Sequence, residues 1–357
     1  MRPTYAEIDL GAIRHNTAAF VGLVGPTEVC AVVKADGYGH GDAPVAAAAL
    51  DAGASRVAVA LAEEGVRLRE AGIEAPILVL SEPDGGSIPG LIEWDLTPTV
   101  YSVEFIEKMG SKAPGTRVHA KVDTGMHRVG ASPRVLHDLV TAVSDAGLEL
   151  EGIWTHFGVA DEDPEFTRHQ IEVFDAAISR YEVPLVHMAN TAATCLFPES
   201  RRDMCRVGLG LYGLHPSLET RDVVDLRPAM RLVSHVSHVQ RLEAGARPSY
   251  GRSRPLSGDA TVVTVPIGYA DGFVRGLSEY GCTLIGGHRY PLAGMVTMDQ
   301  VVVDVGDADV AVGDEVVMLG RQGDQEVTAD EWAEILETIS YEVVCGIGPR
   351  VPRRYIE

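Results

Sequence analysis

Short apolar runs alternate with segments of helical spacing from about residue 29 to residue 212. Eight of these runs are predicted to be strands: residues 29–33, 56–60, 77–80, 96–100, 117–122, 150–155, 185–189 and 204–209. Three intervening segments have recognisable helix ends, because Asp42 precedes an alanine-rich stretch that stops at Gly53, and Gly72 and Gly147 follow the other two. Strands that are apolar throughout are typical of parallel sheets buried on both faces. The pattern favours a (β/α)8 barrel, with a doubly wound sheet as the alternative.

The pattern changes after about residue 228 to period-two valine runs separated by Gly, Pro and Asp. The runs LVSHVSHVQRL, ATVVTVPI, QVVVDV and DEVVMLG predict β-strands. Thr328 and Glu331 form a capping box ahead of a helix expected to extend to Ile339. We therefore expect a barrel domain over residues 8–227 and a β-rich domain over residues 228–357, which the first seven residues could also join.

Composition limits the classes of function. The 357 residues are 46% hydrophobic and 23% charged, as in ordinary globular proteins. Lys and Arg total 30 against 51 Asp and Glu, and the net charge of -21 argues against nucleic acid and anionic membranes as partners. The N-terminus has no basic start followed by an apolar run, and no stretch approaches a membrane span, so we expect a cytoplasmic protein. Five cysteines without a CxxC pair predict buried thiols rather than disulfides or a zinc site.

Active-site groups of such a barrel come from the C-terminal ends of its strands. Lys34 directly follows the first predicted strand. Desolvation at the end of a buried strand lowers a lysine pKa and makes the neutral amine available as a nucleophile, although an ordinary surface lysine would also fit this position. Later strand ends supply further polar groups: Lys121, Asp123, Arg128, His156, Asn190, Thr191 and Arg206.

The segment GLGLYG, residues 208–213, formally matches a dinucleotide-binding fingerprint. That fingerprint belongs to the first strand–turn–helix of a βαβ unit, whereas this segment lies at the end of the strand–helix alternation, and Pro216 interrupts the required helix. A glycine turn at this place is better suited to offering backbone N–H groups to a phosphate. His235 and His238 lie in a strand-like run without partnered ligands, so we expect structural roles and no metal site.

Taken together, these motifs resemble the alanine racemases, pyridoxal-phosphate enzymes that interconvert L- and D-alanine. The matching motifs are AVVKADGYGHG (31–41), KVDTGMHRVG (121–130), WTHF (154–157), HMANTAA (187–193), RVGLGLYG (206–213), SYG (249–251), IGYADG (267–272), MDQ (298–300) and YEV (341–343). They follow the family order and cover nearly the whole chain. The resemblance implies a barrel followed by a β-rich domain, assembled as a homodimer with shared active sites, that supplies D-alanine for cell-wall synthesis.

The resemblance also implies two opposed bases. Lys34 would hold pyridoxal 5'-phosphate as a Schiff base and act on the D face of the substrate, and Tyr250 of the partner subunit would act on the L face. Racemisation needs a group on each face of a planar carbanion, because a single base tends to return the proton to the side it left. A tyrosine with an ordinary pKa near 10 must be poised by its surroundings to accept a proton.

Arg206 would face the pyridine nitrogen of the cofactor, with His156 supporting it. A guanidinium donates a hydrogen bond but scarcely gives up a proton, so the ring stays a weaker electron sink and transamination is disfavoured. The resemblance assigns the rest of the cofactor contacts to Tyr38, Asn190, Thr191, Gly208, Leu209 and Tyr341.

The substrate carboxylate would be bound by Arg128 and by the backbone of Met298 from the partner. Lys121 resembles a lysine that some members carry as a carbamate, which orients the arginine; an unmodified lysine paired with a carboxylate is the alternative. An access corridor would be lined by Asp161, Tyr269 and Arg275. Two departures from the family pattern are the segment Met295–Val296–Thr297, where an arginine usually begins the motif, and His127, where many members have a small residue.

Three alternatives remain open. The first is a related pyridoxal-phosphate racemase acting on serine or basic amino acids. The second is a non-catalytic pyridoxal-phosphate-binding barrel protein, although that family has no second domain. The third is an amino-acid decarboxylase of the same fold type, which would lack the Arg206 pattern.

Overall fold

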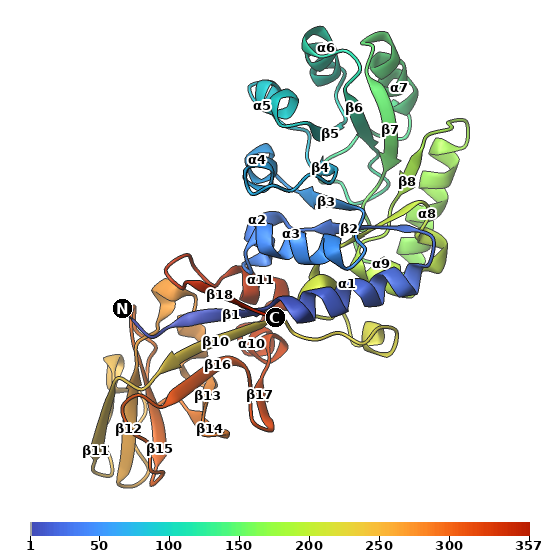
Figure 1. The fold of residues 1–357 in the computed structure, drawn as a ribbon. Coiled ribbons are helices and arrows are strands. Elements are labelled where there is room, and N and C mark those ends of the chain that lie inside the picture. Colours follow the sequence, from blue (N-terminus) through green and yellow to red (C-terminus); the bar gives the residue numbers. More distant parts are fainter. Residues whose placement is uncertain (1) are drawn as a thin grey trace. The chain divides into compact units, whose positions relative to one another are not determined.

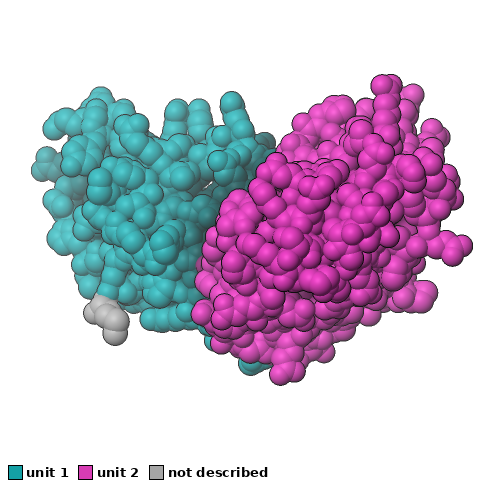
Figure 2. All heavy atoms as spheres, turned by 90° about the horizontal axis from the view of Figure 1, so that it is seen from above, with its two compact units in different colours: residues 1–10, 38–40, 228–357 teal, residues 11–37, 41–227 magenta. Residues whose placement is uncertain are grey.

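The computed structural model describes residues 2–357 and divides them into two compact units (Figures 1 and 2). The barrel unit comprises residues 11–37 and 41–227. The β-rich unit comprises the residues up to Leu10, the short segment 38–40 and residues 228–357. Residues 8–10 therefore lie in the β-rich unit and not in the barrel, contrary to the boundary expected from the sequence.

Eight parallel strands form the barrel sheet (Figure 1). They are β2 (Glu28–Val32), β3 (Arg56–Val59), β4 (Ile77–Val79), β5 (Leu96–Val100), β6 (Arg117–Lys121), β7 (Glu149–Trp154), β8 (Leu185–His187) and β9 (Met204–Val207). Their order is β8-β7-β6-β5-β4-β3-β2-β9. Single hydrogen bonds such as Arg206 N to Ala189 O (2.9 Å) link the segments at the two outer strands, so the barrel is nearly closed. This confirms the predicted barrel, and the doubly wound alternative is wrong.

Helices follow the strands and cover the outside of the sheet (Figure 1). They are α1 (Leu10–Val24), α3 (Asp42–Asp51), α4 (Ala62–Glu70), α5 (Ile88–Glu93), α6 (Val103–Lys112), α7 (Leu136–Asp145), α8 (Pro164–Ile178) and α9 (Thr191–Leu196). Side-chain caps fix several of their starts, since Ser102 accepts a hydrogen bond from Phe105 N and Asp163 accepts one from Phe166 N. No described helix is both long and apolar enough to span a membrane.

The β-rich unit contains a larger and a smaller sheet. The larger has the order β14-β13-β16-β10-β1-β18, with β17 beside β16, and the smaller has the order β11-β12-β15. Their strands are β1 (Tyr5–Asp9), β10 (Met230–His235), β11 (His238–Leu242), β12 (Ala260–Val265), β13 (Cys282–Ile285), β14 (His288–Pro291), β15 (Val301–Gly306), β16 (Glu315–Gln322), β17 (Gln325–Val327) and β18 (Arg353–Ile356). Because β1 pairs with β10 and β18, the start of the chain belongs to this unit.

Two expectations need correction in detail. Thr328 caps α10 (Ala329–Leu336) as predicted, but the helix stops before Ile339, because Glu337 takes a left-handed conformation with φ 54°. A further short helix, α11 (Ser340–Cys345), follows, and the sequence analysis did not anticipate it. Among the cysteines, Cys282 is only partly buried and Cys345 is exposed, so not all five are buried thiols.

Candidate active site

Lys34 leaves β2 through a backbone conformation that is rare for residues with side chains. From Ala35 to Tyr38, φ lies between 51° and 59°, so the segment labelled α2 (Lys34–Tyr38) is one left-handed turn. Left-handed helical geometry costs an L-residue about 1–2 kcal/mol. Residues held in such conformations cluster at functional sites, where surrounding contacts over-determine them.

Glu64 of α4 supplies those contacts. Its side chain is almost fully buried and accepts hydrogen bonds from the backbone amides of Ala35 (2.7 Å), Ala60 (2.8 Å) and Leu61 (3.1 Å). The Gly37 amide donates to Val33 O at 2.9 Å. These bonds fix the start of the turn beside the end of β3 and so give Lys34 a defined origin. Sequence reasoning missed Glu64, because a glutamate in the first turn of a helix is common for reasons of helix stability alone.

Arg206 of β9 is a buried cation, with 3% of its surface exposed. Its Nη1 donates to His187 Nδ1 (2.8 Å), and its Nη2 donates to Thr155 O (2.8 Å), Met188 O (3.1 Å) and His156 Nδ1 (3.2 Å). Burial lowers the pKa of Arg206 to about 10, which still leaves it charged at neutral pH. Its Nε makes no hydrogen bond to any residue between 2 and 357, so one donor of the guanidinium is left for a ligand.

The predicted cationic residues of the barrel unit influence one another electrostatically. Burial and the charges of Arg206, Lys121, Arg128 and Lys34 hold the pKa of His156 well below its ordinary value, so this histidine is neutral. Lys121 is 3% exposed, and burial, together with Arg128, lowers its pKa to about 8. Trp154 lies beneath both Lys121 Nζ and the Arg206 guanidinium, each 4.5 Å from its ring centre. This arrangement favours an anionic ligand.

Arg128 lies on an exposed loop that Asp123 organises. Asp123 Oδ1 accepts hydrogen bonds from the backbone amides of Gly125 and His127, both at 3.0 Å. The His127 imidazole contacts the other Asp123 carboxylate oxygen at 3.2 Å. The backbone of His127 is left-handed, with φ 56°. The unusual residue His127 therefore helps to hold the turn that precedes Arg128.

The segments after β8 and β9 meet at Thr191. Its Oγ1 accepts a hydrogen bond from the Gly208 amide at 3.0 Å. The Leu209 amide, in contrast, makes no hydrogen bond within the described chain, although Leu209 is fully buried. A buried backbone donor without a partner is costly unless a ligand satisfies it. Asn190, which we expected among the cofactor contacts, uses its Oδ1 to cap α9 through Ala193 N (2.9 Å).

The two predicted phosphate-binding tyrosines, Tyr38 and Tyr341, lie together in the β-rich unit. Their ring centres are 6.2 Å apart and their planes are tilted by 44°. Burial raises the pKa of Tyr38, which keeps its phenol protonated and able to donate. Gly39 packs against α11 so closely that a Cβ there would lie 2.4 Å from Val344 O. Arg353 Nε donates to Gly39 O at 2.9 Å, which fixes the segment 38–40 in this unit.

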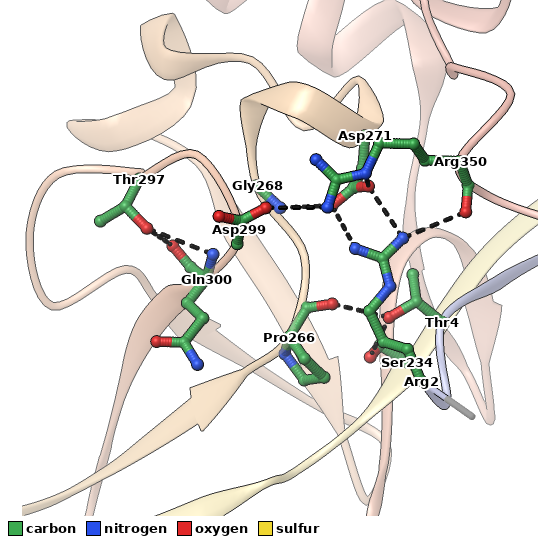
Figure 3. Close-up of polar contacts among 10 residues, drawn as sticks. All are labelled: Arg2, Thr4, Ser234, Pro266, Gly268, Asp271, Thr297, Asp299, Gln300 and Arg350. Carbon is green, nitrogen blue, oxygen red and sulfur yellow. Dashed lines mark hydrogen bonds and ion pairs between the residues drawn. The ribbon is translucent and has the colours of Figure 1, made fainter.

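The buried carboxylate of Asp271 lies among Arg2, Gly268 and Arg350 (Figure 3). Asp271 is fully buried and accepts hydrogen bonds from both terminal nitrogens of Arg2 (2.8 Å each) and from Gly268 N (3.1 Å). Arg350 lies 3.4 Å from Asp271 and also donates to Asp299 at 2.8 Å.

Two backbone bonds connect the loops beside this carboxylate. Tyr269 N donates to Thr297 O at 3.0 Å, and Ala270 N donates to Met298 O at 3.1 Å. A Cβ at Gly268 would meet Thr297 O at 2.2 Å, so only glycine fits there. The loops of the IGYADG and MDQ motifs therefore form one rigid element.

Tyr250 extends from a strained turn on the surface of the β-rich unit. It is 75% exposed and makes no hydrogen bond to residues 2–357. The preceding Ser249 has φ 66° and ψ -174°, a conformation normally restricted to glycine, and its hydroxyl donates to Met295 O at 2.6 Å. Met298 and Tyr269 are also well exposed.

The remaining predicted site residues are not brought into contact by described interactions. Asp161 is half-buried in the barrel unit, and Arg275 is exposed in the β-rich unit, so the access corridor stays a prediction. The structure adds residues that the sequence analysis did not assign to the site: Glu64, His119, Glu151, Trp154 and His187. The available signal was a polar residue inside an apolar strand, as at His119 and Glu151.

Comparisons with known proteins agree over nearly the full chain. The family models described as the N-terminal and C-terminal domains of alanine racemase match residues 8–216 and 229–355. The alanine racemase of Desulforamulus reducens is 43% identical over 99% of both chains. The solved alanine racemase of E. faecalis is 40% identical, with a TM-score of 0.95 over 99% of this chain and 98% of that chain. A solved histidine racemase of Leuconostoc mesenteroides is 28% identical, with a TM-score of 0.92 over 100% and 98%. The chain therefore belongs to the alanine racemase family.

Proposed function

We propose that this chain interconverts L- and D-alanine with bound pyridoxal 5'-phosphate by a two-base mechanism. The observation that carries this proposal is Arg206, a buried cation with a spare Nε donor at the C-terminal end of the barrel strands. Such a donor matches an unprotonated ring nitrogen, which accepts a hydrogen bond but does not need a counter-carboxylate.

The donor set fits the cofactor at two separate points. Arg206 Nε would meet the ring nitrogen, and the unpartnered Leu209 amide would meet the phosphate. Thr191 Oγ1 already accepts from Gly208 N, so its own proton is free to donate to the same phosphate. Tyr38 and Tyr341 would add phenol donors, and Lys34 would hold the cofactor covalently. When bound, the cofactor supplies an electron sink that acidifies the α-hydrogen of the substrate.

The two proposed bases divide the proton transfers. Lys34 Nζ removes or returns the α-proton on the D face, and the Tyr250 phenolate oxygen of a second subunit does so on the L face. Arg128 pairs with the substrate carboxylate through its planar fork, and the Met298 backbone of the second subunit adds a donor. Neutral His156 accepts a hydrogen bond from Arg206 Nη2 and so helps to hold the guanidinium in place.

The family assignment of Lys121 as a carbamate has physical support. A pKa of about 8 leaves roughly a quarter of the amines neutral at pH 7.5, and the neutral amine is the form that adds CO2. The amine nitrogen bonds to the carbon and loses a proton, which gives an anion beside Arg128. Carbon-13 NMR of enzyme equilibrated with labelled bicarbonate should show a carbamate signal that the Lys121→Met variant lacks. If the unmodified enzyme and Lys121→Met give the same spectrum, Lys121 is not carbamylated and is an ordinary buried amine.

Measurement of alanine racemisation with and without added pyridoxal phosphate tests the central proposal. We expect activity only in the cofactor-loaded protein, and loss of both activity and visible cofactor absorbance in Lys34→Ala. Full racemisation by Lys34→Ala would overturn it.

Shared active sites are tested by mixing variants. Lys34→Ala and Tyr250→Phe are each inactive or nearly so in the proposal, but a mixed dimer contains one site with both residues intact. Recovery of part of the activity after mixing is expected. Sites complete within one chain would give no recovery beyond the separate activities.

The histidine racemase among the structural neighbours favours one second candidate, a racemase of another amino acid. Loss of the family arginine at Met295 changes the charge near the expected access corridor. Turnover of an L-amino acid panel that includes serine, histidine and lysine distinguishes the two, because the alanine proposal requires alanine to have the highest kcat/KM. We further propose that the D-alanine serves cell-wall synthesis, which is tested by rescue of a bacterial D-alanine auxotroph.

A further inference from the structure

A chain of four polar side chains runs through the interior of the barrel behind Arg206. Arg206 Nη1 contacts His187 Nδ1 at 2.8 Å, His187 Nε2 contacts His119 Nδ1 at 2.8 Å, and His119 Nε2 contacts Glu151 Oε2 at 2.9 Å. Both histidines are fully buried. Arg56 of β3 reaches Glu151 at 3.3 Å although β3 and β7 lie four places apart in the sheet order, so these groups meet inside the barrel.

The hydrogen bonds of this chain admit one consistent direction. A guanidinium only donates, so His187 Nδ1 must accept and the proton of His187 lies on Nε2. That proton is donated to His119 Nδ1, which places the proton of His119 on Nε2, where it is donated to Glu151. Two neutral imidazoles and one ionised carboxylate satisfy every bond, and tautomers are properly assigned from such networks.

The charge states agree with this direction. Burial lowers the pKa of His119, and burial together with Arg206 lowers the pKa of His187 further, so both rings are neutral. The hydrogen bond from His119 lowers the pKa of Glu151 to about 2, so the carboxylate is ionised. Glu151 also pairs with Arg56 and Arg117, which means that its negative charge is already balanced without Arg206. Glu151 therefore acts on Arg206 by setting the direction of the hydrogen bonds between them, and not by neutralising the charge of the guanidinium.

We propose that Glu151 and His119 are positioning residues for Arg206: they lock His187 in the tautomer that accepts from Nη1 and thereby hold the guanidinium with Nε toward the cofactor ring. The consequence for the reaction rests on the function proposed above. Without the acceptor at residue 151, the protons of both histidines can reverse. His187 would then present Nδ1–H to a guanidinium N–H, and two donors would face each other.

The protonation pattern is tested directly by nitrogen-15 NMR of holoenzyme labelled at histidine. Resonances of His119 and His187 are identified by their loss in His119→Gln and His187→Gln. We expect both rings to be neutral with the proton on Nε2. A proton on Nδ1 of either ring, or an imidazolium at either position at pH 7.5, would overturn the proposal. Because this readout does not use turnover, it fails or succeeds separately from the assigned activity.

Two substitutions of Glu151 separate hydrogen-bond direction from charge. Glu151→Gln keeps a carbonyl oxygen that accepts from His119, whereas Glu151→Met has no comparable acceptor. We expect Glu151→Gln to retain the Nε2–H tautomers and the visible absorbance of the bound cofactor. Glu151→Met should shift that absorbance and lower kcat about tenfold, the effect of one lost bond to a charged group, with KM for alanine changed less than twofold. Equal effects of the two substitutions would show that charge is what matters and refute the inference.

Arg56→Gln provides the matched control. It removes another contact of Glu151 at the same end of the barrel but leaves the chain from His119 to Arg206 intact. Its cofactor absorbance should equal that of the unmodified enzyme. Should Glu151→Met fail to fold, His119→Phe tests the same interruption one step closer to Arg206. If the unmodified enzyme binds the cofactor and the Glu151 and His119 variants all keep its absorbance unchanged, the positioning proposal is wrong. If the unmodified enzyme does not bind the cofactor, the assigned function is wrong instead.

Discussion

Lys34 and Tyr250 differ in how much of their surroundings one chain supplies. Lys34 is partly buried and leaves a turn that Glu64 anchors through a 2.7 Å bond. Tyr250 is 75% exposed and has no hydrogen-bond partner in the described chain. A phenol can act as a base only after it has given its proton to a neighbouring group, and the described residues of one chain place no hydrogen-bond partner at Tyr250. The proposed tyrosine base therefore depends on a second chain far more than the lysine does.

The Tyr250→Phe variant keeps the ring and removes only the phenol oxygen. We expect removal of the α-proton from L-alanine to fall by about 100-fold or more, because general-base catalysis at that face is lost. Exchange of the α-proton of D-alanine with solvent deuterium, followed by proton NMR, should continue. Equal exchange rates from both enantiomers would contradict the two-base proposal. Tyr280→Phe alters another exposed tyrosine of the same unit and should change neither rate.

Glu151 couples the stability of the barrel to pH. The hydrogen bond from His119 lowers its pKa to about 2, whereas an unfolded glutamate titrates near 4.3. A carboxyl group with a lowered pKa in the fold contributes stability that is complete above the unfolded value and is lost as the pH falls from about 4.5 toward 2. Allowing for screening by solvent, we expect about 1–2 kcal/mol. Urea unfolding at pH 7 and pH 3 should show a steeper loss for the unmodified chain than for Glu151→Gln; parallel losses would contradict this linkage.

Among the elements, the left-handed turn after β2 is followed by a glycine that packs closely against α11. Gly39 follows the turn with φ 79°, and a Cβ there would lie 2.4 Å from Val344 O. Gly25 has a similar φ of 64° but no atom within 4 Å of the corresponding position. Both glycines have a positive φ, but only Gly39 has a backbone atom so close that a Cβ would clash with it.

Gly39→Ala should therefore destabilise the protein more than Gly25→Ala. Both pay the conformational cost of an L-residue at positive φ, about 1–2 kcal/mol, and only Gly39→Ala must also displace α11. Thermal unfolding followed by circular dichroism compares them. Gly39→Ala should also weaken pyridoxal-phosphate binding, because α11 carries Tyr341. Identical unfolding midpoints and affinities would contradict the steric argument.

The barrel strands could be predicted from the sequence because each is a short apolar run, and strands buried on both faces have few other patterns available. The left-handed turn and α11 could not. Nothing in the letters KADGY distinguishes left-handed from right-handed geometry, and the turn is held by Glu64, which is distant in sequence. The end of α10 at Leu336 depends on a non-glycine residue, Glu337, in a left-handed conformation, which propensity argues against.

The residues of the candidate site also fall into those that the sequence indicated and those that it did not. Lys34, Arg206 and Thr191 were accessible from motifs because they stand at strand ends. The interior chain of His119, His187 and Glu151 was not, because each is a single polar residue in its own strand and its partners come from other strands. Asn190 has a structural role that its motif position did not indicate, because its Oδ1 caps a helix; its contact with the cofactor stays a prediction.

Across the whole molecule, Asp271 connects distant parts of the β-rich chain. Arg2 near the start and Arg350 near the end both reach this fully buried carboxylate (Figure 3). The two arginine side chains stay partly exposed, whereas Asp271 is buried and depends on their hydrogen bonds and ion pairs.

Asp271→Asn should therefore lower the free energy of unfolding by about 1.5–3 kcal/mol, through loss of hydrogen bonds to a charged group. Asp299→Asn removes a contact of the same Arg350 at a much more exposed carboxylate and should cost less than about 1 kcal/mol. Urea unfolding followed by tryptophan fluorescence measures both. Equal midpoints for the two variants would show that the Asp271 cluster contributes no more than an ordinary surface pair.

The pairing of β1 with β18 has a consequence for biosynthesis. Strand β1 emerges early from the ribosome, but its parallel neighbour, residues 353–356, follows every other strand of the chain. All eight barrel strands are complete by Val207, so the barrel can fold while the other sheet still lacks its last strand. Without residues 353–356, β1 would form the edge of this sheet, whereas in the folded chain β18 occupies that edge. The strand of this sheet that is made first therefore gains its outer neighbour only after all the other described strands have been made.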